Sequence, residues 1–347
     1  MMPGDYLICG FVTLSASALL TICLTVPFSV WLAHQVGAID LPGDLKVHSQ
    51  PIPRLGGVGI VLAFLIVFVM MELVHSLDFS IETYAAVGSA LVVVLLGIVD
   101  DIRGLPQAIK FILEGMVAVG FMWALADLFT WWLAVAAWFG LIGLTNAYNF
   151  IDGLDGLASG LAVINFTGLS VLFFLDDMFL LSLLTLVGAG ACLGFLRFNW
   201  QPAQVFMGDG GALGIGFLIA SLSVLYVGVG EWSWSRIVAA ILVAALPVGD
   251  VVFTFVRRLV GRQSLLPGDL FPGDRFHFYD QMRANAGLST KSTVIITYKV
   301  GFTLATFGVV AYFLPSLWAV VVGLLGVALL ISLAFRYKIS IPRLEEV

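Results

Sequence analysis

Charged residues are scarce in this chain. Lys, Arg, Asp and Glu make up 11% of its 347 residues, whereas hydrophobic residues make up 61%. A soluble globular domain carries roughly 25% charged residues. One water-soluble fold cannot hide this much apolar surface, so the composition excludes a wholly soluble protein. The net charge of −6 also argues against a nucleic-acid partner, because such a partner requires a basic surface.

Cysteine is scarce as well, and Cys9, Cys23 and Cys192 all lie within apolar runs. They show no metal-binding or disulfide spacing, so we interpret them as packing residues. No Lys or Arg precedes the first apolar segment. A secretory signal peptide has a basic start and a short apolar core. We therefore expect the first segment to be a retained membrane span.

Long apolar runs, by contrast, fill most of the chain. A membrane-spanning helix needs about 20 apolar residues, and on that measure we expect about 11 spans. The sequence therefore predicts an all-α, polytopic membrane protein with a single membrane-embedded domain over residues 1–347. The expected spans lie near residues 6–33, 56–75, 82–99, 105–126, 129–148, 157–175, 179–196, 212–229, 236–258, 293–313 and 316–336.

The basic residues are distributed unevenly between the two sets of loops. If the N-terminus lies outside, 15 of the 16 Lys and Arg residues fall on the inner side and only Arg236 falls outside. Because cytoplasmic loops carry an excess of Lys and Arg, we expect a cytosolic C-terminus. The outer turns are short and rich in Trp and Tyr, as in an interfacial aromatic belt. The long polar loops are all inner, so the function they carry should be cytosolic.

The first inner loop carries the cations Lys46, His48 and Arg54, which suit a phosphate ligand. Pro51 and Pro53 fix its backbone. An ordinary loop on the positive side of a membrane would explain the charges but not the proline scaffold. We therefore favour a binding function for this loop.

Asp100 and Asp101 end an apolar run at the expected inner face. Two adjacent carboxylates there can bind Mg²⁺ or supply a base. The alternative is a plain helix end, but a helix C-terminus disfavours negative charge. A second pair, Asp176 and Asp177, falls in an expected outer turn, and we interpret it as a solvated loop.

Asn149, Asp152 and Asp155 follow the fifth expected span at a spacing of three. On a helical turn this spacing would place them on one face. Their amide and carboxylate oxygens suit a hard cation and the edge of a base. Gly153 and Gly156 would let the backbone approach a ligand closely.

A glycine-rich segment around Asp209 precedes the eighth expected span. Bare backbone at a helix N-terminus can hold phosphate, and Mg²⁺ would then bridge that phosphate and the carboxylate. Phe206 offers a ring for stacking on a base. The alternative is a glycine-rich turn in which Asp209 caps the helix.

Two further positions stand out near the end of the chain. Asp250 lies inside the ninth expected span, where it is either a functional residue or the structural partner of a nearby Arg. In the last inner loop, Arg275 and His277 alternate with aromatic residues. This pattern is typical of an arm that folds over a phosphate or sugar.

Taken together, Asp100-Asp101, the stretch 149–156 and the stretch 206–211 resemble, in this order, the polyprenyl-phosphate N-acetylhexosamine-1-phosphate transferase family, also called glycosyltransferase family 4. Its members include bacterial initiators of lipopolysaccharide O-antigen, enterobacterial common antigen and teichoic acid linkage units. Phospho-N-acetylmuramoyl-pentapeptide transferase is a relative. The resemblance covers about residues 37–285.

The resemblance implies the reaction. A UDP-amino sugar donates its N-acetylhexosamine 1-phosphate to undecaprenyl (polyprenyl) phosphate, and UMP is released. This would be the first membrane step of cell-envelope polysaccharide synthesis, at the cytosolic face of the bacterial cytoplasmic membrane. It requires Mg²⁺, with Mn²⁺ as an alternative. A homodimer is left open.

The expected site residues follow from the motifs and the resemblance together. We expect catalytic roles for Asp100, Asp101, Asp152 and His277; substrate binding by Lys46, His48, Arg54, Asp155, Phe206 and Arg275; and metal binding by Asn149 and Asp209.

The last-loop motif departs from the family pattern. Many members specific for N-acetylglucosamine resemble Asp-Arg-x-His-x-His-His, whereas residues 274–280 read Asp-Arg-Phe-His-Phe-Tyr-Asp. That is closer to members that use 6-deoxy sugars such as N-acetylfucosamine or N-acetylquinovosamine. The muramoyl-pentapeptide relative has Thr-Pro-Thr where this chain has residues 51–53, so we disfavour that substrate.

Two other classes of protein compete with an enzyme. A polytopic cation-coupled transporter would use Asp152 and Asp250 near the membrane, but transporters usually show internal repeats and binding groups at the bilayer midplane. No repeat is visible here. A scaffold that recruits partners would not need clusters of oxygen ligands for Mg²⁺.

Overall fold

The computed structural model describes residues 3–42, 50–75, 79–260, 277–337 and 339. Nearly all of them are helical, which confirms the predicted fold class. The elements are α1 (Pro3–Leu20), η1 (Thr21–Thr25), α2 (Val26–Val36), β1 (Ile39–Asp40), β2 (Ile52–Pro53), α3 (Gly56–His75), α4 (Ile81–Arg103), α5 (Gln107–Ala124), η2 (Ala126–Leu128), α6 (Trp131–Ile151), α7 (Leu157–Leu175), α8 (Phe179–Asn199), α9 (Gly208–Val229), α10 (Trp234–Val243), α11 (Ala245–Val260), α13 (Phe278–Ala286), α14 (Thr290–Tyr312) and α15 (Ser316–Arg336).

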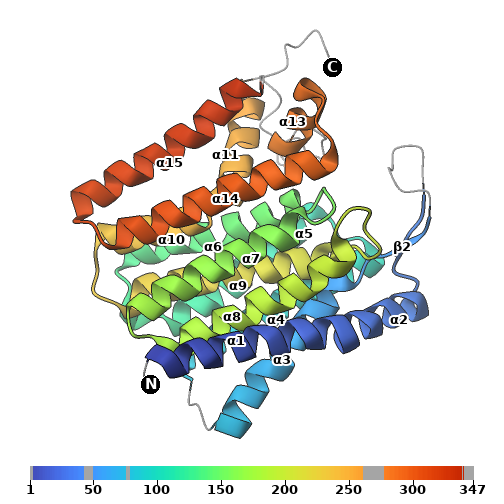
Figure 1. Ribbon diagram of the computed structural model, residues 1–347, viewed down its shortest axis with the longest axis horizontal. Coiled ribbons are helices and arrows are strands. Elements are labelled where there is room, and N and C mark those ends of the chain that lie inside the picture. Colours follow the sequence, from blue (N-terminus) through green and yellow to red (C-terminus); the bar gives the residue numbers. More distant parts are fainter. Residues whose placement is uncertain (1–2, 43–49, 76–78, 261–276, 338, 340–347) are drawn as a thin grey trace.

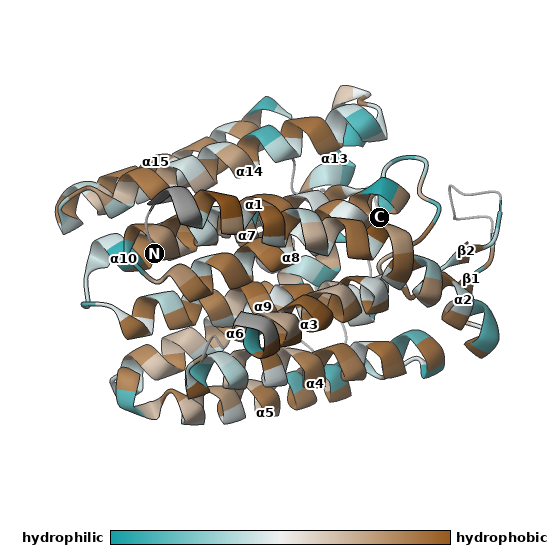
Figure 2. Ribbon diagram, turned by 60° about the horizontal axis from the view of Figure 1, so that its bottom comes forward, coloured by the Kyte–Doolittle hydropathy of each residue, from teal (hydrophilic) through white to brown (hydrophobic). Residues whose placement is uncertain are grey.

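The long helices lie roughly side by side in one bundle, with α7, α8 and α9 toward its middle (Figure 1). Most residues of these three helices are buried. Hydrophobic residues fill most of the length of the helices (Figure 2). Peripheral helices such as α1 and α15 expose many large apolar side chains. Because exposed apolar surface of this extent is stable only in lipid, the bundle is a membrane domain.

Ten helices in the described part of the chain are long and apolar enough to span a membrane, and a bent helix pair brings the total to as many as 11. The bent pair is α10 and α11, which meet at 79°. The sequence predicts the ninth span over 236–258, and the structure adds a sharp bend within it. Pro247 lacks the N–H that would bond to the carbonyl of Val243, and the helix breaks between them.

A short antiparallel pair of strands, β1 and β2, lies between α2 and α3, with Ile39 opposite Pro53. It connects to the segment before α9 through backbone hydrogen bonds. Phe206 N donates to Pro53 O at 2.8 Å, and Gly56 N donates to Phe206 O at 2.9 Å. These bonds fix the first loop against the start of α9.

Glycine makes this junction possible because the backbones of α3 and α9 almost touch. A Cβ atom on Gly57 would lie 2.1 Å from the Cα atom of Gly211. Gly208 has φ of +76°, and a Cβ there would lie 2.1 Å from Arg54 O. The glycines around Asp209 are expected to bring bare backbone to a phosphate, but Gly208 and Gly211 here make room for the backbone of Arg54 and Gly57.

The end of the bundle opposite β1 and β2 carries several exposed tryptophans. Trp131 and Trp234 begin α6 and α10, and Trp318 lies in the first turn of α15. All three are exposed, as an interfacial belt requires.

The interpretation of Asp176 as a solvated loop residue is wrong. The buried guanidinium of Arg236 donates to Asp176 Oδ2 and lies 4.1 Å from the centroid of the Tyr226 ring. A buried Arg requires a counter-ion, and Asp176 supplies it. Asp177 is exposed, as expected.

Candidate active site

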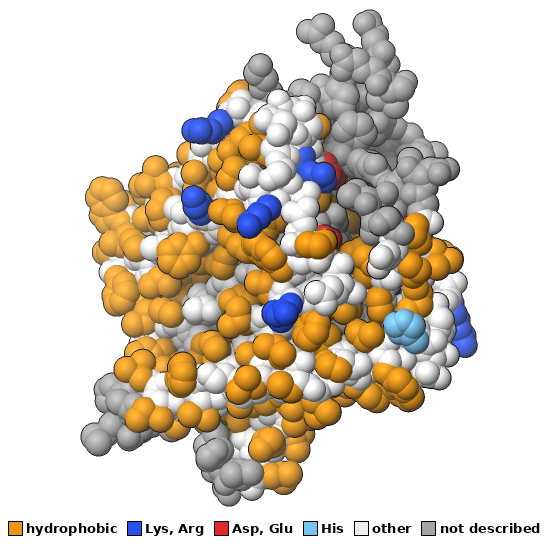
Figure 3. All heavy atoms as spheres, turned by 45° about the vertical axis from the view of Figure 1, so that its right-hand side comes forward, with side chains coloured by type: hydrophobic (Ala, Val, Ile, Leu, Met, Phe, Trp, Pro, Cys, Tyr) orange, Lys and Arg blue, Asp and Glu red, His pale blue; other side chains and the backbone are white. Residues whose placement is uncertain are grey.

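A polar pocket of about 470 Å³ lies at the end of the bundle that carries β1 and β2. Figure 3 turns this end forward and shows Lys and Arg side chains spread over it, with small patches of acidic side chains between them. The lining comes from the first loop, the α6–α7 turn, the α8–α9 segment, α13 and the start of α14. Six of the site residues predicted from the sequence line the pocket: Arg54, Asn149, Asp152, Asp155, Phe206 and Asp209.

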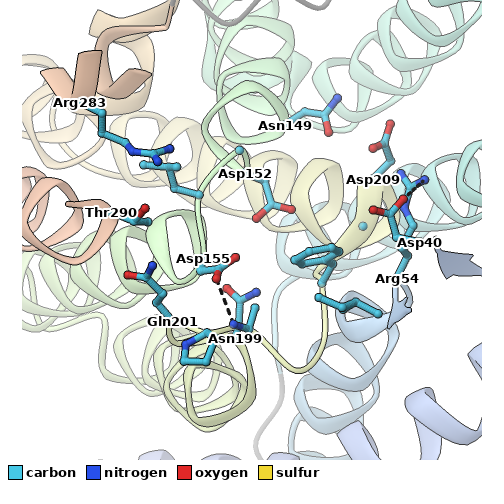
Figure 4. Close-up of a pocket in the computed structure, with 17 residues that line it drawn as sticks. Asp40, Arg54, Asn149, Asp152, Asp155, Asn199, Gln201, Asp209, Arg283 and Thr290 are labelled. Atoms are coloured by element: carbon cyan, nitrogen blue, oxygen red, sulfur yellow. Dashed lines mark hydrogen bonds and ion pairs between the residues drawn. The ribbon is translucent and has the colours of Figure 1, made fainter. Parts of the chain in front are cut away.

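The segment 149–155 reaches the pocket in a way the sequence did not predict. Of the three selected residues Asn149, Asp152 and Asp155, only Asn149 is helical, because α6 ends at Ile151 and a turn follows. The expected single helical face is therefore wrong, yet Asn149, Asp152 and Asp155 all surround the same space (Figure 4).

The α6–α7 turn is held by Asn199, the last residue of α8. Its Oδ1 accepts hydrogen bonds from Gly156 N at 3.0 Å and from Ser159 Oγ at 3.1 Å. Asp155 Oδ2 accepts a bond from Ala203 N at 3.0 Å. Gly156 itself has φ of +79°, which favours glycine. Asp155 is thus positioned by the backbone of the α8–α9 segment.

Asp152 lies among other carboxylates. Burial raises the pKa of its carboxyl well above the ordinary value, and repulsion from Asp209, Asp101 and Asp155 adds to the shift. A group that resists ionisation in this way gains most from a cation placed nearby. The electrostatics of the pocket thus favour binding of positive charge.

Lys110 joins two of the expected acidic residues. Its Nζ atom lies 2.5 Å from Asp100 Oδ2 and 2.9 Å from Asp209 Oδ2. Asp100 also accepts a bond from Leu105 N at 2.5 Å. Asp100 is on α4, Lys110 on α5 and Asp209 on α9, so this ammonium fixes the ends of three helices.

Asp101 is engaged differently from its neighbour. Its two oxygens accept bonds from the backbone amides of Asp209, at 3.1 Å, and Gly210, at 3.0 Å. Asp101 therefore caps α9 from a different helix. The sequence analysis expects these amides to hold a substrate phosphate, but the anion at this helix N-terminus is Asp101.

Arg54 connects the first loop to this cluster. Its guanidinium lies 3.5 Å from Asp101 Oδ1 and 3.7 Å from Asp40 Oδ1, and its side chain is 40% exposed. At these distances both pairs are loose. Arg54 can therefore turn toward a phosphate in the pocket without breaking a tight ion pair.

Among the described side chains, Asp250 pairs with His277. His277 Nδ1 lies 2.8 Å from Asp250 Oδ2, and Phe278 N donates to Asp250 Oδ1 at 2.6 Å. The imidazole is buried and stacks between Phe150 and Tyr279. It lies behind the segment 149–155 and is not among the pocket-lining residues.

Lys46, His48 and Arg275 lie outside the described residues. The structure also brings forward residues that the sequence analysis did not select. Lys110 and Glu114 were hidden inside an expected span, and Lys110 counted only as an inner basic residue. Arg283 counted in the same way, yet it lines the pocket with Asp40. A charged residue inside an apolar span was the available signal for both Lys110 and Glu114.

The oxygen donors fit Mg²⁺ that binds together with a substrate. In the described part of the chain, no three His, Cys, Asp or Glu side chains form a ready-made metal site. Mg²⁺ is commonly held by one or two carboxylates, with waters and substrate phosphates completing its coordination. Asn149 and Asp209 line the same pocket. Asp209 already pairs with one cation, the ammonium of Lys110.

Comparison with known proteins agrees with these motifs. A family model described as glycosyl transferase family 4 matches residues 83–227. The chain is 33% identical over 310 residues to a probable undecaprenyl-phosphate N-acetylglucosaminyl 1-phosphate transferase of Bacillus subtilis, which covers 84% of this chain and 82% of the relative.

Two other relatives are also similar. The chain is 30% identical over 373 residues to decaprenyl-phosphate N-acetylglucosaminephosphotransferase of Mycobacterium tuberculosis, covering 92% of this chain and 88% of the relative. It is 30% identical over 228 residues to phospho-N-acetylmuramoyl-pentapeptide-transferase of Listeria welshimeri, covering 58% and 69%. The resemblance inferred from the motifs is thereby confirmed. The chain belongs to glycosyl transferase family 4 and is a membrane-embedded transferase.

Proposed function

We propose that this enzyme transfers an N-acetylhexosamine 1-phosphate from a UDP-linked amino sugar to polyprenyl phosphate, giving polyprenyl-diphosphate-sugar and UMP. The observation that carries the proposal is the convergence of Asn149, Asp155, Phe206 and Asp209 on one pocket at the end of an apolar bundle. A soluble nucleotide sugar can enter from the aqueous side, while the lipid phosphate arrives along the membrane. The names of the relatives support the same reaction class.

The pocket offers cationic side chains for phosphates and oxygen donors for a metal ion, and this reaction needs both. Arg54 and Arg283 lie on opposite sides of it (Figure 4) and suit the phosphates of two anionic substrates. Asp155 and Phe206 offer an acceptor and a ring for uracil. Asn149 and Asp209 would hold Mg²⁺, which neutralises the diphosphate when bound.

The chemistry requires little covalent help from the protein. An oxygen of the lipid phosphate attacks the sugar-bearing phosphorus, a new P–O bond forms, and the bond to the bridging oxygen breaks as UMP leaves. A phosphate monoester has a second pKa near ~6, so the attacking oxygen is already largely ionised. Positioning and charge neutralisation then supply most of the rate acceleration.

We place the pocket at the cytosolic face of the bacterial cytoplasmic membrane. The loops that carry most Lys and Arg residues are expected at the same end of the spans as the pocket, and such loops are typically cytoplasmic. In cell-envelope synthesis this would be the first membrane step. The motif at 274–280 favours a 6-deoxy or otherwise modified N-acetylhexosamine over N-acetylglucosamine.

The test is release of UMP by purified protein supplied with polyprenyl phosphate, Mg²⁺ and one UDP-sugar at a time. UDP-N-acetylglucosamine and its 6-deoxy analogues are compared. UMP that depends on the lipid supports the proposal. No UMP with any of these sugars would overturn it, and cation-driven uptake by reconstituted vesicles would favour the transporter instead.

A further inference from the structure

Glu114 is a buried carboxylate outside the pocket lining, and it has no role in the reaction as described above. It lies on α5 and is 1% exposed. Lys110 precedes it by four residues on the same buried face of that helix. Side chains at this spacing are neighbours on a helix surface.

The hydrogen bonding of Glu114 is only half complete. Asn146 Nδ2 donates to its Oε2 atom at 2.6 Å. Its Oε1 atom has no hydrogen-bond partner among the described residues. A buried carboxylate oxygen without a partner is costly, so such an atom indicates a partner that arrives in another state of the protein.

Lys110 is the candidate for that partner, because it lies one helical turn before Glu114 and its ammonium now pairs with Asp209. The distance from Nζ to Asp209 Oδ2 is 2.9 Å. A divalent cation at Asp209 would compete for this oxygen and repel the ammonium. Lys has a long flexible stem, so its ammonium can move while its backbone stays in place.

We propose that Glu114 is a positioning residue that receives the ammonium of Lys110 when a divalent cation binds at Asp209. Before the metal binds, Lys110 neutralises the carboxylates of Asp100 and Asp209. After the metal binds, Lys110 pairs with Glu114. Glu114 thereby acts on the metal only through Lys110. This inference rests on the proposed metal requirement of the transferase, and it concerns binding alone.

Mg²⁺ titration of the purified full chain tests the inference, in the presence of UDP to supply the diphosphate and without lipid. Binding is followed by calorimetry and by the rise in melting temperature. Glu114→Gln keeps an acceptor for Asn146 but removes the charge, and it should weaken Mg²⁺ binding about tenfold. Lys110→Gln removes the competing cation and should tighten Mg²⁺ binding.

The decisive comparison is the double variant. If Glu114 acts through Lys110, Glu114→Gln has no effect on Mg²⁺ affinity in the Lys110→Gln background. An equal loss in both backgrounds, or no loss in either, would overturn the proposal, as would an absence of Mg²⁺ binding to the unaltered chain. Glu114→Asp keeps the charge with a shorter reach, and it should also weaken binding only while Lys110 is present.

Glu82→Gln serves as the matched control, since Glu82 lies in the first turn of α4, at the opposite end from Asp100. Its Mg²⁺ affinity should equal that of the unaltered chain. The two proposals fail separately. UMP release without this coupling would refute the role of Glu114 alone, whereas the coupling without UMP release would refute the transferase reaction alone.

Discussion

The carboxylate of Asp101 accepts a hydrogen bond from the backbone amide of Asp209, the residue we expect to hold the metal, at 3.1 Å. Asp101 therefore positions the first turn of α9, on which Asp209 lies. Its neighbour Asp100 instead contacts Lys110. The two adjacent acids have different structural tasks, and their substitution should have different consequences.

Replacing Asp101 with Ala should destabilise the fold as well as impair transfer. Two amides at the start of α9 lose their acceptor, and loss of a helix cap costs about 1–2 kcal/mol. Thermal unfolding in detergent measures the effect. Asp127→Ala, at an exposed position, is the control and should leave the melting temperature unchanged. An equal melting temperature for Asp101→Ala would exclude the capping role.

Replacing Asp209 with Ala should abolish most transfer at saturating Mg²⁺. The variant removes the carboxylate that would anchor the metal at the diphosphate, and losses of one such electrostatic group are about 10²–10³ in rate. Initial rates of UMP release measure it. Near-normal activity would refute the metal role of Asp209.

Asp152→Asn should make the metal-free protein more stable near neutral pH while it lowers activity. Burial raises the pKa of the Asp152 carboxyl above its ordinary value of 3.8, so the folded chain binds a proton more tightly than the unfolded chain. The free energy of unfolding then falls as pH rises from 3.8 through the raised pKa.

In the Asp152→Asn variant this part of the pH dependence should vanish, because the amide does not titrate. Melting temperatures of the variant and the unaltered protein, measured between about pH 4 and neutrality, make the comparison. Identical slopes would show that the Asp152 carboxyl ionises in the folded protein without a penalty.

Arg283→Ala should weaken the binding of an anionic substrate. Arg283 lines the pocket, and its Nε atom has no partner among the described residues. Loss of a hydrogen bond to a charged group is worth about 1.5–3 kcal/mol, so KM should rise roughly tenfold or more. Arg336→Ala, an exposed position outside the pocket, is the control. An unchanged KM for both donor and lipid would remove Arg283 from the site.

Gly57→Ala should disrupt the junction of α3 and α9, because the added Cβ would lie 2.1 Å from Gly211 Cα. We expect loss of activity with a lower melting temperature. Gly88→Ala, where nothing lies within 4 Å of the added atom, is the matched control and should be neutral or slightly stabilising. Full activity of Gly57→Ala would contradict the close packing at this junction.

Much of the site could be predicted from the sequence, because the order of the spans determines which loops lie at the same end of the bundle. Once the spans are assigned, Asn149, Asp155 and Asp209 must meet at one end of the bundle. Their convergence on one pocket is what the structure shows. Pro247 was the sequence signal for the bend between α10 and α11. The prediction did not include the bend, because the apolar run around Pro247 is long enough for one straight span.

The rest depended on tertiary contacts that no local pattern records. The bond from the start of α9 to Asp101 joins residues 108 positions apart. Lys110 and Glu114 lie on an otherwise apolar helix, and only their packing against α4, α6 and α9 gives them partners. The pairing of Arg236 with Asp176 was missed for the same reason.

The fate of the β-phosphate of the donor distinguishes transfer of the sugar 1-phosphate from transfer of the sugar alone. UDP-N-acetylhexosamine labelled with ³²P at the sugar-bearing phosphorus is incubated with the enzyme, polyprenyl phosphate and Mg²⁺. If the enzyme transfers the sugar 1-phosphate, the label passes to the lipid product and unlabelled UMP is released. Label retained in a released UDP would show transfer of the sugar alone and would refute the proposed reaction.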